Sequence, residues 1–368
     1  MTSLFFFGTM QHRALFDAVA GDCSHIRLSP AELADYSVQA VLEGPFPTLV
    51  AKQGTTAPGL LAEGVTDAEL ARLDYYEGAF GYVLRDVVLA DGRAARVYMA
   101  QQDLWTANGA WSLALWAEDW GPLSVLAADE VMGYMGQKPP EDIAQMFPMI
   151  RARAWSTLNA AQGGSAQDRF RGRVDITERR RMYAEYFALD EFDLSHERFD
   201  GSMTPQLMRA VFVAADAAHV LPYDPVRDRV LVIEQMRLGP LARGDAALWQ
   251  LEPIAGRLDP GETPQEAVRR EAIEETGVSI GALHAVGETY SSPGNSTEFH
   301  YTYVGIADLP DDAGGVGGLD AEEEDIRSHV MDFDTLMAQC DTQRIVNAPL
   351  VLIAYWLARH RDRLRASS

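Results

Sequence analysis

The stretch that most constrains this chain is residues 256–278, GRLDPGETPQEAVRREAIEETGV. It carries the signals that begin and end a helix. Thr263 suits the N-cap, Pro264 suits the first helical position, and Glu266 completes a capping box with the N-cap residue. Gly277 can adopt the left-handed conformation that ends a helix. The sequence therefore predicts a helix between Thr263 and Gly277.

Three carboxylates share one face of this predicted helix. At 3.6 residues per turn, Glu271, Glu274 and Glu275 fall within an arc of roughly 100°. Like charges this close repel each other by about a few tenths of a kcal/mol per pair. Arg270 can supply a counter-charge, and a divalent cation with oxygen ligands can supply more. The alternative is a solvated acidic face, which is the usual meaning of a run of charges.

The spacing favours metal binding over a solvated face. The stretch fits the pattern G-x5-E-x7-R-E-U-x-E-E-x-G-U, where U marks a hydrophobic position. The matching residues are Gly256, Glu262, Arg270, Glu271, Glu274, Glu275, Gly277 and Val278. This pattern resembles the Nudix box, and the resemblance implies an α/β/α sandwich whose acids bind a divalent metal. Ala272 departs from the pattern where a larger aliphatic residue is common, which concerns packing and not chemistry.

The charge of the chain limits its partners. The formal net charge is −23, from 54 acidic and 31 basic residues. Such a chain repels nucleic acid and anionic membranes, and we expect neither as a partner. It also repels a diphosphate substrate, unless bound Mg²⁺ and local arginines reverse the potential. The charge therefore favours a magnesium cofactor, for which Mn²⁺ is a possible substitute.

The cysteines and the apolar segments indicate the compartment. Cys23 and Cys340 are the two cysteines and lie far apart, so we expect no disulfide framework and a reducing compartment. The segment MTSLFFFGTM lacks the basic region of a signal peptide. No stretch reaches the ~20 apolar residues of a transmembrane helix. We expect a cytoplasmic protein.

We expect residues 1–105 to form a first domain of α+β class. Its mainly antiparallel sheet should form a small barrel. The whole chain has 368 residues, which is long enough for two domains with separate cores. Gly and Asp-Gly turns separate the strand-like segments, and the helical stretch TDAELARLDYYEG interrupts them. These segments are Leu4–Phe7, YSVQAVLEG, PTLVAKQG, TTAPGLLAEGV, YVLRDVVLA and RAARVYMA.

Several short motifs of this first domain form a second resemblance. They are FGTM (7–10), GPFPTLV (44–50) and LDYYEG (73–78), followed by Tyr82 and Arg85. Together they resemble the γ-glutamylcyclotransferase-like (AIG2-like) family. The family usually begins its first motif with Tyr, where this chain has Phe7.

This resemblance implies a chemistry for the first domain. Glu77 would be the general acid/base that moves a proton while a γ-glutamyl amine closes to 5-oxoproline. The turn of Gly8, Thr9 and Met10 would hold the substrate. The alternative is a domain of the same fold that binds a ligand or has lost activity.

Residues 106–171 are predicted to be a helical connector and linker, and residues 172–368 a second, Nudix domain. Trp and Met recur at helical spacing in the connector, which is typical of core packing. The segment GGSAQDRFRGR (163–173) has the composition of a linker.

Segments outside the box resemble the bacterial ADP-ribose pyrophosphatases of the Nudix family. They are RAVFVAADAAHVLPYDPVRDRVLVIEQMR, LWQLEPIAGRLDPGE, SSPGNSTEF and LDAEEEDIRSH. The resemblance implies Mg²⁺-dependent hydrolysis of ADP-ribose, or of a related nucleoside diphosphate sugar, to AMP and ribose 5-phosphate. The implied metal ligands are Glu271, Glu275 and the backbone of Ala255, with Glu274 and Glu324 as further ligands.

The same resemblance implies roles for other residues. Glu322 would position or deprotonate the attacking water, although three consecutive glutamates (322–324) leave this register open by one residue. Glu274 and Arg270 are further catalytic candidates. Substrate contacts are implied for Arg237, Glu298 and Arg209, the last from an N-terminal arm. Related pyrophosphatases are homodimers, so a homodimer through the second domain is expected.

Three functions are compatible with the sequence. The first is a Mg²⁺-dependent Nudix hydrolase, and the second is a cyclotransferase that acts through Glu77. The third is a non-catalytic sensor that binds such ligands, and the complete set of Nudix acids argues against it. The order of the two domains also resembles that of TrgB-type proteins associated with tellurite resistance.

Overall fold

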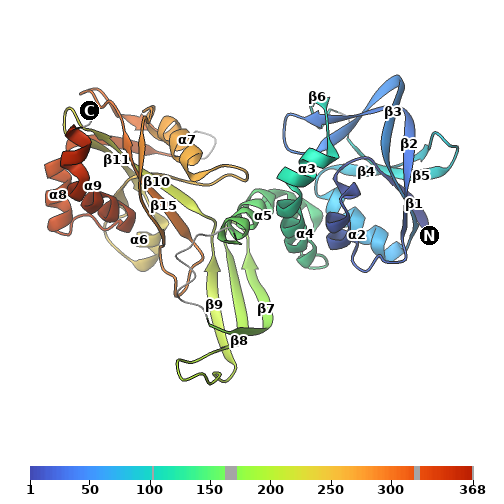
Figure 1. Cartoon of the computed structure of the whole chain (residues 1–368), viewed down its shortest axis with the longest axis horizontal. Coiled ribbons are helices and arrows are strands. Elements are labelled where there is room, and N and C mark those ends of the chain that lie inside the picture. Colours follow the sequence, from blue (N-terminus) through green and yellow to red (C-terminus); the bar gives the residue numbers. More distant parts are fainter. Residues whose placement is uncertain (102, 162–171, 319–323, 367–368) are drawn as a thin grey trace. The chain divides into compact units, whose positions relative to one another are not determined.

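The computed structural model describes residues 1–101, 103–161, 172–318 and 324–366 (Figure 1). The chain forms two compact units, Met1–Gly164 and Ser165–Ser368. Each unit has its own sheets and its own hydrophobic core. The described strands and helices are of mixed α/β type in both units.

A six-stranded sheet in the order β4-β5-β1-β3-β2-β6 forms the centre of the first unit. Only the β1–β5 pair is parallel among its described pairs. The strands are β1 (Thr2–Phe6), β2 (Arg27–Val41), β3 (Pro47–Val65), β4 (Tyr82–Val88), β5 (Ala94–Ala100) and β6 (Ala107–Ala110). Because β4 and β6 end this order, the described strands do not close a barrel, and the predicted barrel is not confirmed.

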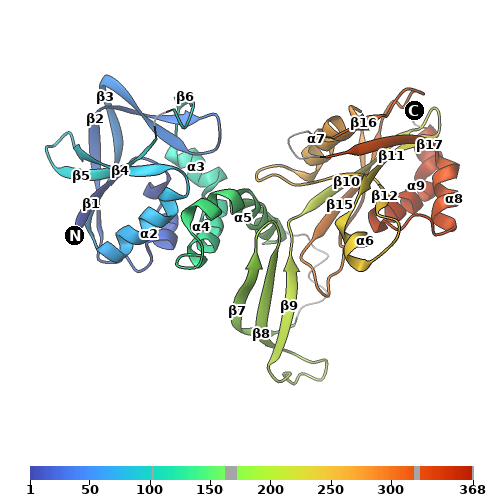
Figure 2. The ribbon, with the colours of Figure 1, turned by 180° about the vertical axis from the view of Figure 1, so that it is seen from behind.

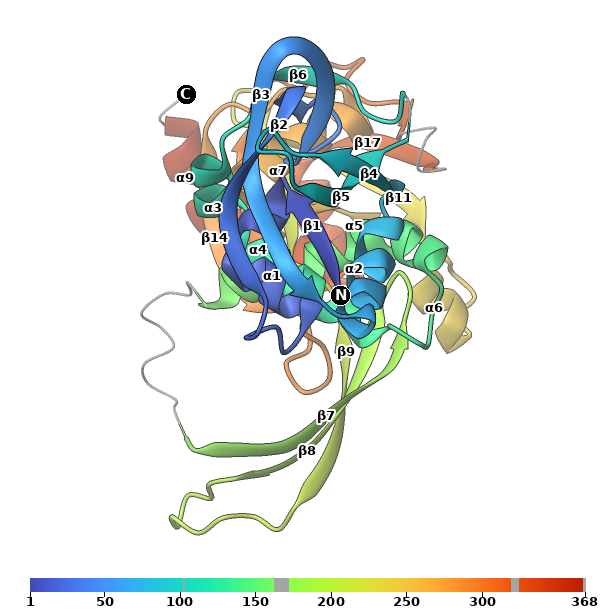
Figure 3. The same ribbon diagram turned by 90° about the vertical axis from the view of Figure 1, so that its right-hand side faces the viewer.

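Strand β3 is longer than the sequence suggested. The segments PTLVAKQG and TTAPGLLAEGV were predicted as separate strands, but they form one strand of 19 residues. Gly54 marks a bulge and not a turn. The ladder between β2 and β3 shifts register between Ala34 and Tyr36, and the Gly54 N–H donates to Asp35 Oδ1 at 2.8 Å. Figure 3 shows β2 and β3 as a long paired ribbon.

Helices cover this sheet within the first unit. Helix α4 packs on α1 and on α2, and α5 packs on α4 and on α2. The segment predicted as a connector therefore contributes helices that belong to the first unit. The helices are α1 (Arg13–Ala20), α2 (Asp67–Gly78), α3 (Leu113–Asp119), α4 (Gly121–Gly133) and α5 (Pro140–Ala161), with a 3₁₀ turn η1 (Thr9–Gln11).

An eight-stranded mixed sheet forms the core of the second unit, with β14-β15-β10-β11-β17-β16 along its main path. Strand β12 pairs with β11, and β13 pairs with β10. The strands are β10 (Ala217–Asp224), β11 (Arg229–Met236), β12 (Trp249–Glu252), β13 (Ile254–Arg257), β14 (Leu283–Tyr290), β15 (Phe299–Ile306), β16 (Val316–Gly317) and β17 (Ile326–Asp332).

Helices lie on both faces of this second sheet. Figures 1 and 2 show α7 (Pro264–Thr276) on one face, and α8 (Phe333–Asp341) and α9 (Ala348–Ala366) on the other. A short helix, α6 (Leu238–Arg243), follows β11. The core beneath α8 and α9 is fully buried and joins Leu221 and Val304 of the sheet to Leu357 of α9.

A separate three-stranded antiparallel sheet begins the second unit. Its strands are β7 (Val174–Ala184), β8 (Ala188–His196) and β9 (Leu207–Val213). Arg179 and Arg181 of β7 both hold the fully buried carboxylate of Asp190 on β8. This sheet lies where the resemblance implied an N-terminal arm, and its strand β9 carries Arg209.

Two properties of the described chain bear on its environment. Cys23 and Cys340 are both buried and free, and they lie in different units. Across the ranges that the structure describes, none of the helices combines the length and the apolar character needed to span a membrane.

Candidate functional site

Helix α7 begins and ends as the sequence predicted. Thr263 Oγ1 accepts a hydrogen bond from the Glu266 N–H at 3.3 Å, and the Glu266 carboxylate accepts one from the Thr263 N–H at 2.9 Å. Gly277 ends the helix with a φ of 70°. The predicted capping box and C-terminal glycine are therefore confirmed. These ends fix the rotation of the helix, so that its acids face the strand β13.

Arg270 is the counter-charge of this acidic face. Its Nη1 donates to Glu271 Oε1 at 2.7 Å and to Glu274 Oε2 at 3.0 Å. Its Nε donates to Glu262 Oε1 at 2.9 Å. These hydrogen bonds raise the pKa of Arg270 although burial opposes the rise. The pairing that the sequence suggested for Arg270 is confirmed.

Gly256 allows the backbone of β13 to pass very close to the acids. A Cβ at this position would lie 1.6 Å from Glu271 Oε1, which is far inside any permitted contact. The backbone around Ala255 and Gly256 therefore lies directly against the Glu271 carboxylate. A larger residue at Gly256 would displace that carboxylate.

Glu275 is the most deeply buried of the three acids, with 2% of its surface exposed. Burial, and then the charges of Glu271 and Glu324, raise the pKa of Glu275 to about 9. Its Oε2 has no hydrogen-bond partner. A buried, unpartnered carboxylate oxygen beside other carboxylates fits a divalent cation with oxygen ligands.

The acids do not form a ready metal centre by themselves. Among the described residues, no group of three or more His, Cys, Asp or Glu side chains could hold a metal ion as placed. Arg270 instead holds Glu271 and Glu274 through direct ion pairs. A cation would therefore compete with this guanidinium for the same oxygen atoms.

Arg237 lies beside the acid cluster. Burial lowers its pKa, but the hydrogen bond to Glu252 and the charges of Glu275 and Glu324 outweigh burial and raise it. Arg237 Nε and Nη2 donate to Glu252 Oε2 at 2.9 and 2.6 Å. Glu252 was not predicted from the sequence, where its one signal is a lone acid within an apolar strand segment.

Glu298 belongs to a cluster with two histidines on β10 and β15. Its Oε2 lies 3.3 Å from His300 Nε2, and this hydrogen bond lowers the pKa of Glu298. The rings of His300 and His219 are 4.5 Å apart. Burial lowers the pKa of His219 to about 3, and neither of its ring nitrogens has a hydrogen-bond partner. The charges of Glu298 and Arg237, two predicted substrate contacts, both act on His219.

Three further predicted residues have different positions. Glu324 lies within the described residues, and its charge helps to raise the pKa values of Glu271, Glu275 and Arg237. Glu322 lies outside the described residues. Arg209 is exposed on β9, where its Nη1 donates to the Met208 carbonyl oxygen at 2.8 Å. The structure thus gathers most of the predicted Nudix residues, while Arg209 keeps its hydrogen bond within the arm.

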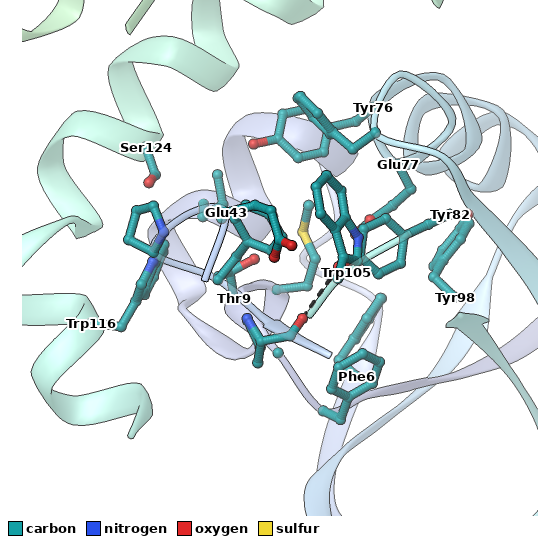
Figure 4. A pocket seen from close by; sticks show the side chains of 18 of the residues that line it. Phe6, Thr9, Glu43, Tyr76, Glu77, Tyr82, Tyr98, Trp105, Trp116 and Ser124 are labelled. Atoms are coloured by element: carbon teal, nitrogen blue, oxygen red, sulfur yellow. Dashed lines mark hydrogen bonds between the residues drawn. The ribbon is translucent and has the colours of Figure 1, made fainter. Parts of the chain in front are cut away.

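The first unit contains a cavity of about 270 Å³ (Figure 4). Glu77, at the end of α2, lines this cavity together with Gly8, Thr9 and Met10. Burial raises the pKa of Glu77 to about 8, so that the carboxyl group is largely protonated at neutral pH. The structure therefore brings together the four residues that the sequence predicted for this domain.

Aromatic side chains form most of the rest of the cavity, and most of them were not predicted from the sequence. They come from segments far apart in the chain, so that no local pattern joins them. These residues are Phe5, Phe6, Phe7, Phe46, Tyr76, Phe80, Tyr82, Tyr98, Trp105, Trp116 and Phe147. The cavity is a predominantly apolar pocket with a few polar groups, which is typical of small-molecule sites.

Comparison with known proteins decides the family of the second unit. The NUDIX domain profile matches residues 214–351. The ADP-ribose pyrophosphatase of Escherichia coli K12 is 36% identical over 192 residues, which are 52% of this chain and 91% of that protein. This chain belongs to the Nudix family. It is a Nudix hydrolase, and Nudix hydrolases generally use divalent metal ions, typically Mg²⁺.

Other relatives define the breadth of this similarity. The ADP-ribose pyrophosphatase of Haemophilus influenzae is 29% identical over 53% of this chain and 90% of that protein. The GDP-mannose pyrophosphatase of Pectobacterium atrosepticum is 30% identical over 49% of this chain and 91% of that protein. Each of these relatives matches only about half of the Nudix hydrolase described here.

The first unit matches a different family. The profile described as gamma-glutamyl cyclotransferase, AIG2-like, covers residues 4–120. The chain therefore joins an AIG2-like domain to a Nudix domain, as the two sequence resemblances predicted. The α4 and α5 helices follow the matched segment but pack within the same unit.

Proposed function

We propose that the second unit hydrolyses the diphosphate of ADP-ribose, or of a related nucleoside diphosphate sugar, and releases AMP and ribose 5-phosphate from ADP-ribose. The observation that carries this proposal is the cluster of Glu271, Glu274 and Glu275 against Gly256, with Arg237 beside it. Relatives named for ADP-ribose and for GDP-mannose support the substrate class.

We assign the metal ligands to the same cluster. Glu271, Glu275 and the carbonyl oxygen of Ala255 would hold Mg²⁺, or Mn²⁺ in its place, with Glu274 and Glu324 as further ligands. The unpartnered Oε2 of Glu275 supports this assignment. A bound divalent ion would neutralise the diphosphate and lower the pKa of a water molecule.

The remaining residues position the substrate and the proton. The Arg237 fork suits two phosphate oxygens, and its pairing with Glu252 fixes the orientation of that fork. Glu298 is suited to accept a hydrogen bond from a ribose hydroxyl. Glu322 is the proposed base for the attacking water. Arg209 would reach the substrate from the arm.

We also propose a homodimer formed through the Nudix unit. Apolar side chains on the arm support this proposal because they are largely exposed in one chain. Ile176 is 59% exposed, Met208 56% and Phe212 41%. Light scattering of the purified protein tests the dimer, and a monomeric mass would contradict it.

A hydrolysis assay tests the main proposal. Purified chain is incubated with ADP-ribose or GDP-mannose, with Mg²⁺, with Mn²⁺ or with EDTA, and the nucleotide products are separated by chromatography. We expect AMP from ADP-ribose with either metal and none with EDTA. A higher kcat/KM for GDP-mannose would keep the reaction but change the substrate. Absence of any nucleoside monophosphate from both substrates would refute the proposal.

A second function is favoured for the first unit, where Glu77 shares a cavity with the Gly8–Met10 turn. In a γ-glutamyl amine, the α-amino nitrogen attacks the γ-carbonyl carbon, and the amide C–N bond breaks. Glu77, protonated at neutral pH, gives its proton to the leaving amine nitrogen and takes one from the attacking nitrogen, so that 5-oxoproline and a free amine form and the carboxyl group is restored. Formation of 5-oxoproline from a γ-glutamyl amine tests this function.

The resemblance to tellurite-resistance proteins leads to one further expectation. We infer that loss of the chain lowers growth in the presence of tellurite and that the wild-type chain restores it. Complementation with a Glu275→Gln variant would show whether the Nudix site is responsible. Normal growth of the deletion strain on tellurite would contradict this inference.

A further inference from the structure

Arg151 is the one cationic side chain among the described residues that line the pocket of the first unit. It belongs to α5, as does Phe147, while Ser124 belongs to α4. All three line the pocket, and all three lie beyond residues 4–120, the segment that matches the AIG2-like family. This wall of the pocket is therefore built by helices outside the matched segment.

Aromatic packing fixes α5 against the rest of the pocket. The rings of Phe147 and Phe80 are 4.5 Å apart, and those of Phe80 and Tyr76 are 5.4 Å apart. The Arg151 guanidinium lies over the ring of Trp120, with its Cζ 5.3 Å from the ring centroid. Stacking on an aromatic face orients a guanidinium without removing its charge. The cation therefore has a defined place in a largely apolar pocket.

Arg151 and Glu77 both line the pocket. Both charges act on the pKa of the Tyr76 hydroxyl, which Glu77 raises and Arg151 lowers. The raised pKa of Glu77 itself has burial as its cause. In Figure 4, Glu77 lies on one side of the pocket, and Trp116 of α3 and Ser124 of α4 lie on the other.

We propose that Arg151 binds the carboxylate of the leaving amine, so that the pocket takes γ-glutamyl derivatives of apolar amino acids in preference to those of simple amines. The inference rests on the cyclotransferase function proposed above, which places the γ-glutamyl end of the ligand at Glu77 and at the Gly8–Met10 turn. The other end of the ligand then reaches the wall formed by α4 and α5, beside α3.

The chemistry of that wall fits such a leaving group. A guanidinium pairs with a carboxylate through two charge-assisted hydrogen bonds, and an apolar surrounding strengthens this attraction. The rings of Trp116 and Phe147 offer contacts to an apolar side chain. Because the whole chain carries a net charge of −23, an anionic ligand needs a local cation of this kind.

A matched pair of ligands tests this specificity. γ-Glutamyl-phenylalanine and γ-glutamyl-phenethylamine differ only in the carboxylate of the leaving group. Binding is measured by calorimetry on the full chain with Glu77→Gln, which slows turnover during the titration. We expect the phenylalanine derivative to bind roughly 10- to 100-fold more tightly. Adding Arg151→Met should weaken that ligand alone and bring the two Kd values within about twofold. Adding Arg151→Lys should keep part of the preference.

Controls separate the possible failures. The variant Arg27→Met removes a cation that is 75% exposed and outside the pocket, and it should leave both Kd values unchanged. Equal affinity of the two ligands would overturn the inference. Equal weakening of both by Arg151→Met would also overturn it, because Arg151 would then hold the glutamyl end or the fold. Turnover by the wild-type chain is a separate measurement: absence of 5-oxoproline refutes the cyclotransferase function, even where Arg151-dependent binding persists.

Discussion

The two candidate sites of this chain use buried carboxyl groups in opposite ways. In the Nudix unit, several acids lie together, and Arg270 neutralises part of their charge. In the first unit, Glu77 stands among aromatic rings, and burial is the cause of its raised pKa. A cluster of charges attracts a cation, whereas a single protonated carboxyl in an apolar pocket can move a proton. The difference indicates two chemistries that can be removed independently.

The largest effect is expected when the charges of the Nudix cluster are removed, which tests whether the two sites act independently. The double variant Glu271→Gln, Glu275→Gln loses two proposed metal ligands but keeps the shape of both side chains. We expect ADP-ribose hydrolysis to fall by on the order of 10⁴-fold. Formation of 5-oxoproline should not change. The matched control is Glu288→Gln, an exposed acid on β14. Retained hydrolysis in the double variant would contradict the assignment.

The converse variant is Glu77→Gln, which removes the acid of the first unit. We expect cyclisation of a γ-glutamyl amine to fall by about 10²- to 10³-fold, because general acid/base catalysis contributes about this much. Hydrolysis of ADP-ribose should stay at the wild-type rate. If one variant abolished both activities, the two sites would not be independent.

The raised pKa of Glu77 predicts how the stability of the first unit depends on pH. Its pKa is about 8 when folded and about 4.5 when exposed, so between these values the unfolded chain binds fewer protons. The stability of the first unit should therefore fall as pH rises from about 4.5 to 8, by a few kcal/mol at most, and then level off. Denaturant unfolding followed by tryptophan fluorescence measures this slope. Glu77→Gln should flatten it, and an unchanged slope would refute the burial argument.

A smaller effect is expected where a residue only orients the site. Glu252→Gln weakens the ion pair that holds Arg237. We expect KM for ADP-ribose to rise by roughly tenfold with little change in kcat, because a charge-assisted hydrogen bond contributes about 1.5–3 kcal/mol. A loss confined to kcat would show instead that Glu252 acts on the reacting atoms.

The smallest effects concern the two capping boxes. Thr66 caps α2 with Glu69, which is buried, and Thr263 caps α7 with the exposed Glu266. Replacing either threonine by Ala should cost about 1 kcal/mol of stability. We expect the larger loss for Thr66→Ala, since it leaves part of a buried carboxylate unpaired. Thermal unfolding of both variants measures the difference, and the reverse order would contradict it.

The two sites also differ in how far the sequence predicted them. The Nudix helix was predictable because its cap, its acids and its final glycine lie within one short segment and act through helix geometry. Arg270 could be predicted as the partner of its neighbours for the same reason. Glu252 and His219 could not, because β-sheet pairing brings them to the site from separate strands.

The pocket of the first unit was predicted only in part. Glu77 and the Gly8–Met10 turn belong to short motifs, whereas Trp105, Phe147 and Arg151 meet them only after the helices pack. The strand β3 shows a related limit, since Gly54 suits a turn and a bulge equally well from sequence alone. The partner strand decides between them: Asp35 of β2 accepts the Gly54 N–H and lets the ladder continue.

The most direct test of the account is the metal dependence of ADP-ribose hydrolysis by the wild-type chain and by Glu77→Gln and Glu275→Gln. Product formation is followed while Mg²⁺ is titrated into metal-free protein. The account predicts AMP and ribose 5-phosphate from the wild-type chain and from Glu77→Gln, with the same dependence on Mg²⁺, and almost none from Glu275→Gln. Equal hydrolysis by Glu275→Gln, or no AMP from the wild-type chain at any concentration of Mg²⁺ or Mn²⁺, would contradict it.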